Sequence, residues 1–517
     1  MKLCNPSVRA GRSLFALTLA ATVAGGCTQG PALLPANQRH AIDRALVECP
    51  PGYELKPVVR NLSAPTAIAF DQEGSLLIAD NGLNDDCRIF GYKTDGTAFD
   101  IYPKTLKLPF GISGGKVRLY GPIGGMVAAN GKIYVAHRDR NHRGVVTAFD
   151  YNGVAQTIVA DLPAEGDHGL TDLVFSRVDG RLYFGVGSMT NSGVVGLDNW
   201  DVGWVSDAEA ACDVPAVAVK LLGYRFDTSN PRQTIFGGKD VAVTAPFQPF
   251  GVSNQMWVRP AHSGKSTASI YSVSTAGGDL RLEAHGIRCA RGLAFNDFGR
   301  LYATNQGMEL RGTRPVKDDP DVLLRIIRST WYGWPDFSAD LQSVTEARFQ
   351  PSSEMIIKTG YPELSILIDH STSGLMRPDR STLLQASFTP LSGAAKMDFV
   401  PASGPFRGFY GSVLIALSGD HAPFANNGKP LAEPVGFKIV QVDVDNRQTH
   451  DFIYNTNRIP AHLGNRNIDS LERPYDVKFG PDGALYILDM GRLDVNDGNF
   501  KPVGRSGKIL RLDPIGQ

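Results

Sequence analysis

The chain has no excess of charge of either sign, and this balance limits the partners that it could have. Its 517 residues include 52 Lys+Arg and 52 Asp+Glu, so the formal net charge is zero. A protein that binds nucleic acid, or that is held electrostatically on an acidic membrane, normally presents a basic excess. We therefore expect no nucleic-acid partner, and a membrane contact only through a covalent anchor.

Long apolar runs are also scarce, and the one near the N-terminus is short. After a basic start, the run from Leu14 to Ala24 is too short to span a bilayer. Small residues then precede Cys27, which resembles a bacterial lipoprotein signal with residues 1–26 removed and Cys27 acylated. The alternative is an ordinary secretory signal in which Cys27 is incidental. Both predict export to the cell envelope, and the first predicts a lipid anchor at the periplasmic face of a membrane, with the outer membrane favoured.

Cysteine is rare, and its spacing excludes a common type of metal site. Of the six cysteines, four lie beyond the leader, at Cys49, Cys87, Cys212 and Cys289. None of them forms a CxxC pair, so we expect no structural zinc. Because an exported compartment permits disulfides, Cys49 and Cys87 are predicted to pair.

Glycine, in contrast, is abundant at 56 residues, and much of it belongs to a repeat. Stretches such as "FDQEGSLLIAD", "FSRVDGRLYFGVG" and "FGPDGALYILDMG" share an apolar lead-in, a turn ending in glycine and a second β-prone run. Glycine supplies the positive φ that a tight hairpin requires. The turn glycines of the six copies are Gly74, Gly131, Gly180, Gly299, Gly411 and Gly483.

Six copies of one hairpin predict an all-β fold, a six-bladed β-propeller. We assign residues 1–26 to a signal peptide of the lipoprotein type, 27–55 to a tether and lead-in, and 56–517 to the propeller. A two-domain β-sandwich is the rival all-β architecture, but it would not explain a single hairpin signal along the whole chain. The run "GTRPVKDDPD" is predicted to be a solvated loop, and the tryptophans are predicted to lie in the core or at the rim.

Loops at one end of a propeller meet near its axis, so we looked for polar residues before each hairpin. Seven residues before the hairpin phenylalanines stand Ser63, His168, Arg288, Ser392 and Glu472. A base, a guanidinium and a carboxylate at one loop position are more typical of a ligand site than of a purely structural turn. The pattern therefore predicts a site at the axis that includes His168.

Three longer stretches carry a resemblance to a known family. They are "GDHGLTDLVFSRVDGRLYFGVGSMTNSGVVGLDN", "GIRCARGLAFNDFGRLYATNQGMELRGTRPVKDDPDVLL" and "WYGWPDFS". Over roughly residues 62–512 the chain resembles the glucose/sorbosone dehydrogenase family, which is related to soluble aldose dehydrogenases that use pyrroloquinoline quinone (PQQ).

The resemblance implies a function for several of these residues. PQQ would lie over the propeller axis, and His168, paired with Asp167, would take a proton from an aldose or sorbosone-like sugar or aldehyde while hydride passes to the quinone. Arg288 would contact the cofactor, and Lys396 is a candidate for a second cofactor-binding cation, although it could be a solvated strand lysine. Calcium is expected from the resemblance alone, since no EF-hand-like loop is present.

The chain departs from the family pattern at positions that bear on activity. Ser188 stands where an aspartate is usual, Cys289 replaces an asparagine, and the basic residues expected after the fifth hairpin are missing. Two other functions therefore stay open. One is a non-catalytic propeller that binds a carbohydrate or a partner. The other is a calcium-dependent lactonase, for which the available oxygen ligands would be Asn305, Asp420, Glu472 and Asp489.

The lipoprotein hypothesis predicts that cells producing the protein incorporate labelled palmitate into it, and that Cys27→Ala loses the label. The reason is that acylation requires the thiol of this residue. Immunoprecipitation followed by autoradiography measures the outcome, and an exported wild-type protein that never takes up label would contradict the hypothesis.

Overall fold

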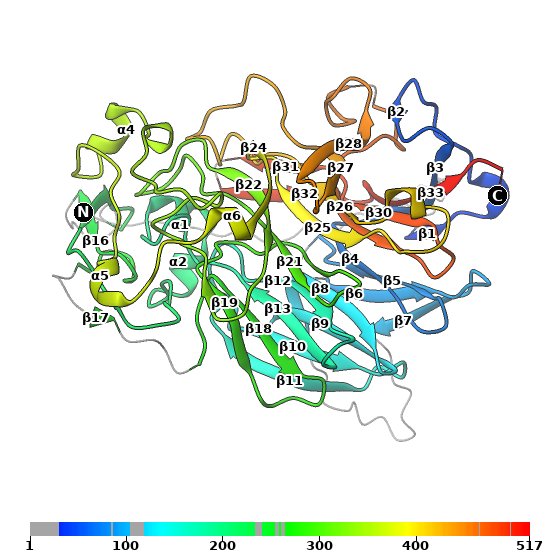
Figure 1. The fold of residues 1–517 in the computed structure, drawn as a ribbon, viewed down its shortest axis with the longest axis horizontal. Coiled ribbons are helices and arrows are strands. Elements are labelled where there is room, and N and C mark those ends of the chain that lie inside the picture. The colour runs from blue at the N-terminus through cyan, green and yellow to red at the C-terminus, as the bar shows by residue number, and fades with distance from the viewer. Residues whose placement is uncertain are drawn as a thin grey trace, which may run out of the picture.

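The computed structural model describes residues 30–83, 86–103, 118–232, 240–253, 258–259, 264–464, 466–496 and 498–516. Cys27 and the predicted signal peptide lie outside the described residues. The chain forms six sheets of four or five strands, one for each blade of a β-propeller, which confirms the predicted fold class (Figure 1). Among the described residues, no helix combines the length and apolarity needed to cross a membrane.

The first three blades follow one another along the chain. Blade 1 contains β4 (Pro65–Phe70), β5 (Leu76–Asp80), β6 (Arg88–Tyr92) and β7 (Ala98–Tyr102). Blade 2 contains β8 (Tyr120–Ala129), β9 (Lys132–Arg138), β10 (Gly144–Phe149) and β11 (Ala155–Leu162). Blade 3 contains β12 (Leu170–Phe175), β13 (Arg181–Val186), β18 (Ser269–Ser274) and β19 (Arg281–His285), with β23 (Thr330–Trp331) added in parallel.

The last three blades complete the ring. Blade 4 contains β20 (Leu293–Phe295), β21 (Leu301–Asn305), β22 (Pro320–Arg325) and β24 (Leu384–Pro390). Blade 5 contains β25 (Ala394–Phe399), β26 (Ser412–Leu417), β27 (Lys438–Asp443) and β28 (Gln448–Asn455), with β2 (Val47–Glu48) at its edge. Blade 6 contains β29 (Pro474–Phe479), β30 (Leu485–Asp489), β33 (Gly507–Pro514) and β3 (Tyr53–Leu62), with β1 (Ala32–Leu33) outermost.

The repeated hairpin is the inner pair of strands in every blade. All six of the predicted turn glycines have positive φ, from 69° at Gly131 and Gly180 to 89° at Gly411. The N-terminal strand β3 pairs antiparallel with the C-terminal strand β33, so the first and last parts of the chain share blade 6 and close the ring. Residues 30–55 therefore do more than lead into the propeller, because β1, β2 and the start of β3 extend two blades.

Six clusters of buried apolar side chains hold the blades together, one between each neighbouring pair. The predicted disulfide is wrong, because Cys49 packs between blades 5 and 6, whereas Cys87 packs between blades 1 and 2.

Polar contacts near the axis also join neighbouring blades. The carboxylates of Asp172, Asp398 and Asp476 each accept a backbone N–H from the inner strand of the next blade, at 2.9–3.0 Å.

Two long insertions build a lobe beside the propeller. The first insertion follows β13 of blade 3, and the second follows β23 in the connection to β24. The two share a core that includes Phe247, Trp331 and Trp334. Figure 1 shows helices α1, α2, α4 and α5 together with β16 and β17 at one side of the molecule, opposite β5 and β7. The lobe contains α1 (Leu197–Val202), α2 (Trp204–Asp207), β14 (Val219–Lys220), β15 (Phe226–Ser229), β16 (Val241–Thr244), β17 (Val258–Arg259), η2 (Ala347–Phe349), α4 (Ser353–Ile357) and α5 (His370–Ser373). The remaining short elements are η1 (Ala36–Gln38), α6 (Arg380–Leu383), η3 (Arg407–Phe409), β31 (Leu493–Asn496) and β32 (Asn499–Pro502).

The contact between blades 2 and 3 depends on glycine. A Cβ atom on Gly124 would lie 2.0 Å from the carbonyl oxygen of Leu170, and one on Gly125 would lie 2.3 Å from the backbone nitrogen of Leu173. Both clashes are with backbone atoms, which cannot move aside as a flexible side chain can. These two glycines therefore allow the inner strands β8 and β12 to approach at the axis.

We predict that Gly124→Ala lowers the free energy of unfolding by about 1–3 kcal/mol or more, because the added methyl group overpacks a backbone contact. Gly408→Ala is the matched control, since a Cβ there meets nothing within 4 Å. Urea or thermal unfolding of both variants measures the difference, and equal stability of the two variants would contradict the close approach of β8 and β12.

Candidate functional site

A cavity of 580 Å³ opens at the end of the propeller axis where the second strand of each blade ends. Residues at or just after those strand ends line it: Asn81, Arg138, Gln306, Ser418 and Met490. The corresponding residue of blade 3 is Gly187, where a Cβ atom would lie 2.4 Å from the Cβ of His168. Glycine at this position therefore leaves the space into which the His168 side chain fits.

His168 lines this cavity and is 8% exposed. Its Nε2 atom is buried and has no hydrogen-bond partner among the described residues. Burial, followed by the positive charges of Arg288, Arg291 and Arg311, holds the pKa of His168 well below its ordinary value of 6.5. The imidazole is therefore neutral at physiological pH and has a nitrogen free to accept a proton.

Asp167 also lines the cavity, but its carboxylate is held by other groups. It accepts hydrogen bonds from the indole Nε1 of Trp204 at 2.8 Å, from the amide of Asn199 at 3.1 Å, and from Arg311 at 2.7 Å. Asp167 thus ties the start of the lobe to blade 3, and these hydrogen bonds do not involve His168. Ser188, which stands where an acid was expected, donates to the carbonyl of Thr190 at 2.6 Å.

Arg311 is the centre of this network, and sequence reasoning did not single it out. Its side chain is only 4% exposed and pairs with three carboxylates, those of Asp167, Asp198 and Glu309. The run "GTRPVKDDPD" that follows it was predicted to be a solvated loop, and this prediction is wrong, because Arg314, Val316 and Asp319 are buried. Burial opposes ionisation of Glu309, but the charges of Arg311 and Arg288 outweigh it and lower the pKa of Glu309 to about 2. Burial raises the pKa of Asp198 to about 6.

Arg288 lies beneath the cavity wall and is 1% exposed. Its Nε donates to the carbonyl of Asn191 and its Nη2 to the Asn191 side chain, both at 3.0 Å, and Glu309 lies 3.4 Å away. Its Nη1 atom is buried without a hydrogen-bond partner among the described residues. Cys289, next in the chain, is completely buried. Arg288 therefore acts on the cavity through its charge and through Glu309, which lines it.

The structure does not bring Lys396 to the cavity. Its side chain is 1% exposed and its Nζ lies 3.1 Å from Asp172, deeper along the axis. Asp172 also accepts the backbone N–H of Leu293, so this carboxylate is committed to the blade 3–blade 4 contact. Lys396 is neither a solvated lysine nor a residue of the cavity wall, but half of a buried axial ion pair.

Besides Arg311 and Glu309, sequence reasoning missed Arg291, Arg473 and His421 in the cavity wall. Arg473 donates to the carbonyls of Ser418 and Gly419, both at 2.9 Å, and to that of Asp420, so its guanidinium is fixed in place. Burial lowers the pKa of His421 to about 3. Counting back a fixed number of residues from the hairpin missed Arg473, because a register irregularity begins β29. His421 follows the second strand of its blade, where that count does not look.

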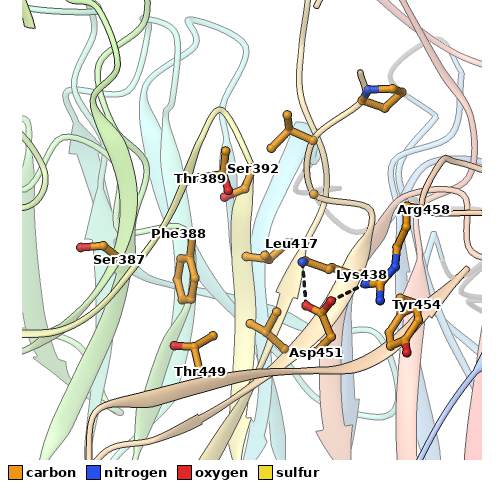
Figure 2. Close-up of a pocket in the computed structure, with 14 residues that line it drawn as sticks. Ser387, Phe388, Thr389, Ser392, Leu417, Lys438, Thr449, Asp451, Tyr454 and Arg458 are labelled. Atoms are coloured by element: carbon orange, nitrogen blue, oxygen red, sulfur yellow. Dashed lines mark hydrogen bonds and ion pairs between the residues drawn. The ribbon is translucent and has the colours of Figure 1, made fainter. Parts of the chain in front are cut away.

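The other residues at the predicted loop position serve different contacts. Glu472 pairs with the Nδ1 of His462 at 2.5 Å, and Ser63 donates its backbone N–H to Asp80. Ser392 lines a separate pocket, also lined by β24 of blade 4 and by β27 and β28 of blade 5 (Figure 2). In that pocket Lys438 and Arg458 both pair with Asp451, so its charged groups largely satisfy one another.

The oxygen ligands considered for a lactonase do not form one site. Asn305 accepts from the backbone of Cys289, Asp420 from Ala422 and Val435, and Asp489 from Glu472, Arg473 and Gly491. Within the part of the chain that the structure describes, no three His, Cys, Asp or Glu side chains gather as a metal site would require.

Comparison with known proteins supports the fold. No family model matches the chain, and no curated protein matches it. Two structures of a Trichoderma reesei carbohydrate-active enzyme of family AA12 are similar, with TM-scores of 0.51 and 0.50 at 15% and 14% identity. They cover 93% and 91% of this chain and are themselves covered over 99% and 98% of their length. The PQQ domain of a pyranose dehydrogenase from Coprinopsis cinerea gives a TM-score of 0.49 at 13% identity, covering 91% of this chain and 98% of that one.

We predict that His168 stays neutral as the pH falls through about 6.5, where an ordinary histidine takes up its proton. The lowered pKa has a consequence for stability. Below pH 6.5 the unfolded chain binds a proton at His168 that the folded chain does not bind, so the contribution of His168 to the free energy of unfolding falls as the pH drops. Histidine-selective NMR, assigned with His168→Gln, follows the titration. A midpoint at or above 6.5 in the folded protein would contradict the buried, cation-flanked environment.

Proposed function

We propose that the protein is an exported quinone-dependent dehydrogenase that binds PQQ in the axial cavity and oxidises a sugar or aldehyde. One observation carries the proposal: His168, buried and neutral, has an Nε2 without a hydrogen-bond partner among the described residues, and it lines a cavity that is also lined by Arg291, Arg311 and Arg473. A general base beside fixed positive charge is the arrangement that abstraction of a hydroxyl proton requires. The resemblance of three sequence stretches to sugar dehydrogenases agrees with it.

The chemistry of the cavity wall fits the cofactor. PQQ is a planar quinone that carries several carboxylates, and guanidinium groups are the side chains best suited to them. Arg291 has a buried Nε without a hydrogen-bond partner among the described residues, and Arg473 is held rigidly by three carbonyl oxygens. A volume of 580 Å³ lies in the ordinary range for small-ligand cavities. Arg291 and Arg473 would hold the carboxylates, and the bound quinone would supply a hydride acceptor.

His168, Asp167 and Arg311 have separate roles in the proposed reaction. His168 takes the proton of the substrate hydroxyl on Nε2, and the neighbouring arginines keep the imidazole neutral until it does so. Asp167 and Arg311 hold the start of the lobe against blade 3, which places Trp204 in the cavity wall. Calcium enters this proposal through the resemblance alone. The lipid anchor at Cys27 would hold the enzyme at the periplasmic face of a membrane.

The two Trichoderma reesei structures agree with the proposal in one respect. Their description as carbohydrate-active enzymes is compatible with a substrate of this class, while identities of 15% and 14% support the shared fold and no residue role. The chemistry of the proposal therefore comes from the cavity itself.

We predict that apo-protein binds PQQ, detected by tryptophan fluorescence quenching, and that Arg291→Met weakens this binding about tenfold or more, because a charged hydrogen bond to a carboxylate is lost. Arg300→Met is the matched control, since Arg300 lies on the same hairpin at its opposite, exposed end. With PQQ and calcium added, aldoses should drive dye reduction, and His168→Ala should abolish turnover while PQQ still binds.

Several outcomes would contradict this function. A folded protein that shows no PQQ binding and no dye reduction would favour the non-catalytic, ligand-binding propeller. Lactone hydrolysis that follows added calcium without PQQ would favour the lactonase. Full activity of His168→Ala would show that another group of the cavity, such as the imidazole of His421, is the base.

A further inference from the structure

The wall of the cavity that faces His168 comes from an extra hairpin. In a ring of six blades, blade 3, which carries His168, lies across the axis from blade 6. Blade 6 has an additional hairpin, β31–β32, inserted between β30 and β33. Leu493, Phe500 and Pro502 of this hairpin line the cavity together with Met490 just before it.

Strand pairing places the apolar residues of the hairpin on one face. Leu493 pairs with Pro502 and Val495 pairs with Phe500, whereas Asp494 pairs with Lys501 on the other face. The Phe500 ring makes edge contacts with Phe424 and His421, with centroids 5.4 Å apart in each case. Leu83 of blade 1 also reaches the cavity. We use "apolar wall" for the following set of side chains: Leu83, Phe424, Met490, Leu493, Phe500 and Pro502.

Four neutral polar side chains of the cavity, those of Thr66, Asn81, Gln306 and Ser418, are already engaged with the protein. The Asn81 side chain accepts from Ile123 N and donates to Thr66, and Thr66 donates to the Ile123 carbonyl. Gln306 donates to the carbonyl of Ala394, and Ser418 to that of Gly393. A free sugar relies on such groups to replace the water that its hydroxyls lose, because a buried hydroxyl without a partner is costly.

We propose that the substrate is an alcohol or a hydrated aldehyde whose body is apolar, an aryl or alkyl compound rather than a free aldose, and that the apolar wall binds this body opposite His168. This inference rests on the proposed dehydrogenase function. The hydroxyl proton would move to His168, and a quinone held by Arg291 and Arg473 would supply the acceptor for the hydride that leaves when the C–H bond breaks. An alcohol thereby yields an aldehyde, and a hydrated aldehyde yields a carboxylic acid, each with two electrons transferred.

The physical reason is the match between the wall and the ligand. Burying hydrocarbon against hydrocarbon is favourable in proportion to the area removed from water, and the edges of Phe424 and Phe500 suit an aryl ring. Nε2 of His168 and Nε of Arg291 are buried without a hydrogen-bond partner among the described residues, and they suit one reacting oxygen and an anionic cofactor. Arg311 is paired with Asp167 and Glu309 of the same cavity, so these charges are less available to the row of hydroxyls on a monosaccharide.

The first test needs no cofactor. Phenylethanol should bind to apo-protein, measured by saturation-transfer NMR and by Trp204-dependent fluorescence, and Phe500→Asn and Leu493→Asn should each weaken binding about tenfold or more. Lys501→Gln, on the exposed face of the same hairpin, is the matched control and should bind like wild type. Phe500→Leu keeps an apolar side chain and should retain most of the affinity.

The second test uses PQQ-loaded protein and compares phenylacetaldehyde with D-glucose. Wild type should show the higher kcat/KM for phenylacetaldehyde, and Phe500→Asn should raise KM for it with a smaller change in kcat. A preference for D-glucose, together with unchanged phenylethanol binding in Phe500→Asn, would overturn the inference while leaving the dehydrogenase intact. Phenylethanol binding that depends on Phe500, in a protein that neither binds PQQ nor reduces dye, would support the apolar wall and remove only the redox function.

Discussion

The close approach of the inner strands at the propeller axis is the constraint on which the rest of the structure depends. Gly124 and Gly125 bring β8 against β12, and the carboxylates of Asp172, Asp398 and Asp476 link later blades to their neighbours. Each carboxylate is buried, so it is stable there only because backbone N–H groups or a cation satisfy it. The fixed axis in turn fixes the six strand ends that surround the cavity.

This constraint also explains how far sequence reasoning succeeded. The repeat depends on turn glycines and buried apolar runs, which are local features, and for that reason it predicted six blades and their inner hairpins correctly. The site depends on which loop residue turns toward the axis, and irregular register at the start of β12, β25 and β29 changes this from blade to blade. The count of seven residues before the hairpin selected His168, which lines the cavity. In blades 4 and 6 the same count selected Arg288 and Glu472 instead of Arg291 and Arg473.

The pairing of charged residues could not be predicted from the sequence, for a related physical reason. A sequence does not show which charges are paired, so Lys396 was predicted to bind the cofactor or to be solvated, and Arg311 was not singled out at all. In the fold, Lys396 lies beside Asp172, and Arg311 is shared by three carboxylates from blade 3, the lobe and its own loop. Each would be costly to bury alone, and each is retained because long-range folding brings its partners to it.

The same pairing determines how the cavity responds to a ligand. Arg311 is neutralised by its carboxylates, which leaves Arg291 and Arg473 as the guanidiniums most available to an incoming anion. Arg291 is also one of the charges that lower the pKa of His168. An anion that pairs with Arg291 offsets this effect and raises the pKa of His168, so anion binding and proton affinity are linked in both directions. A ligand rich in carboxylates would therefore strengthen His168 as a base when, and only when, it occupies the cavity.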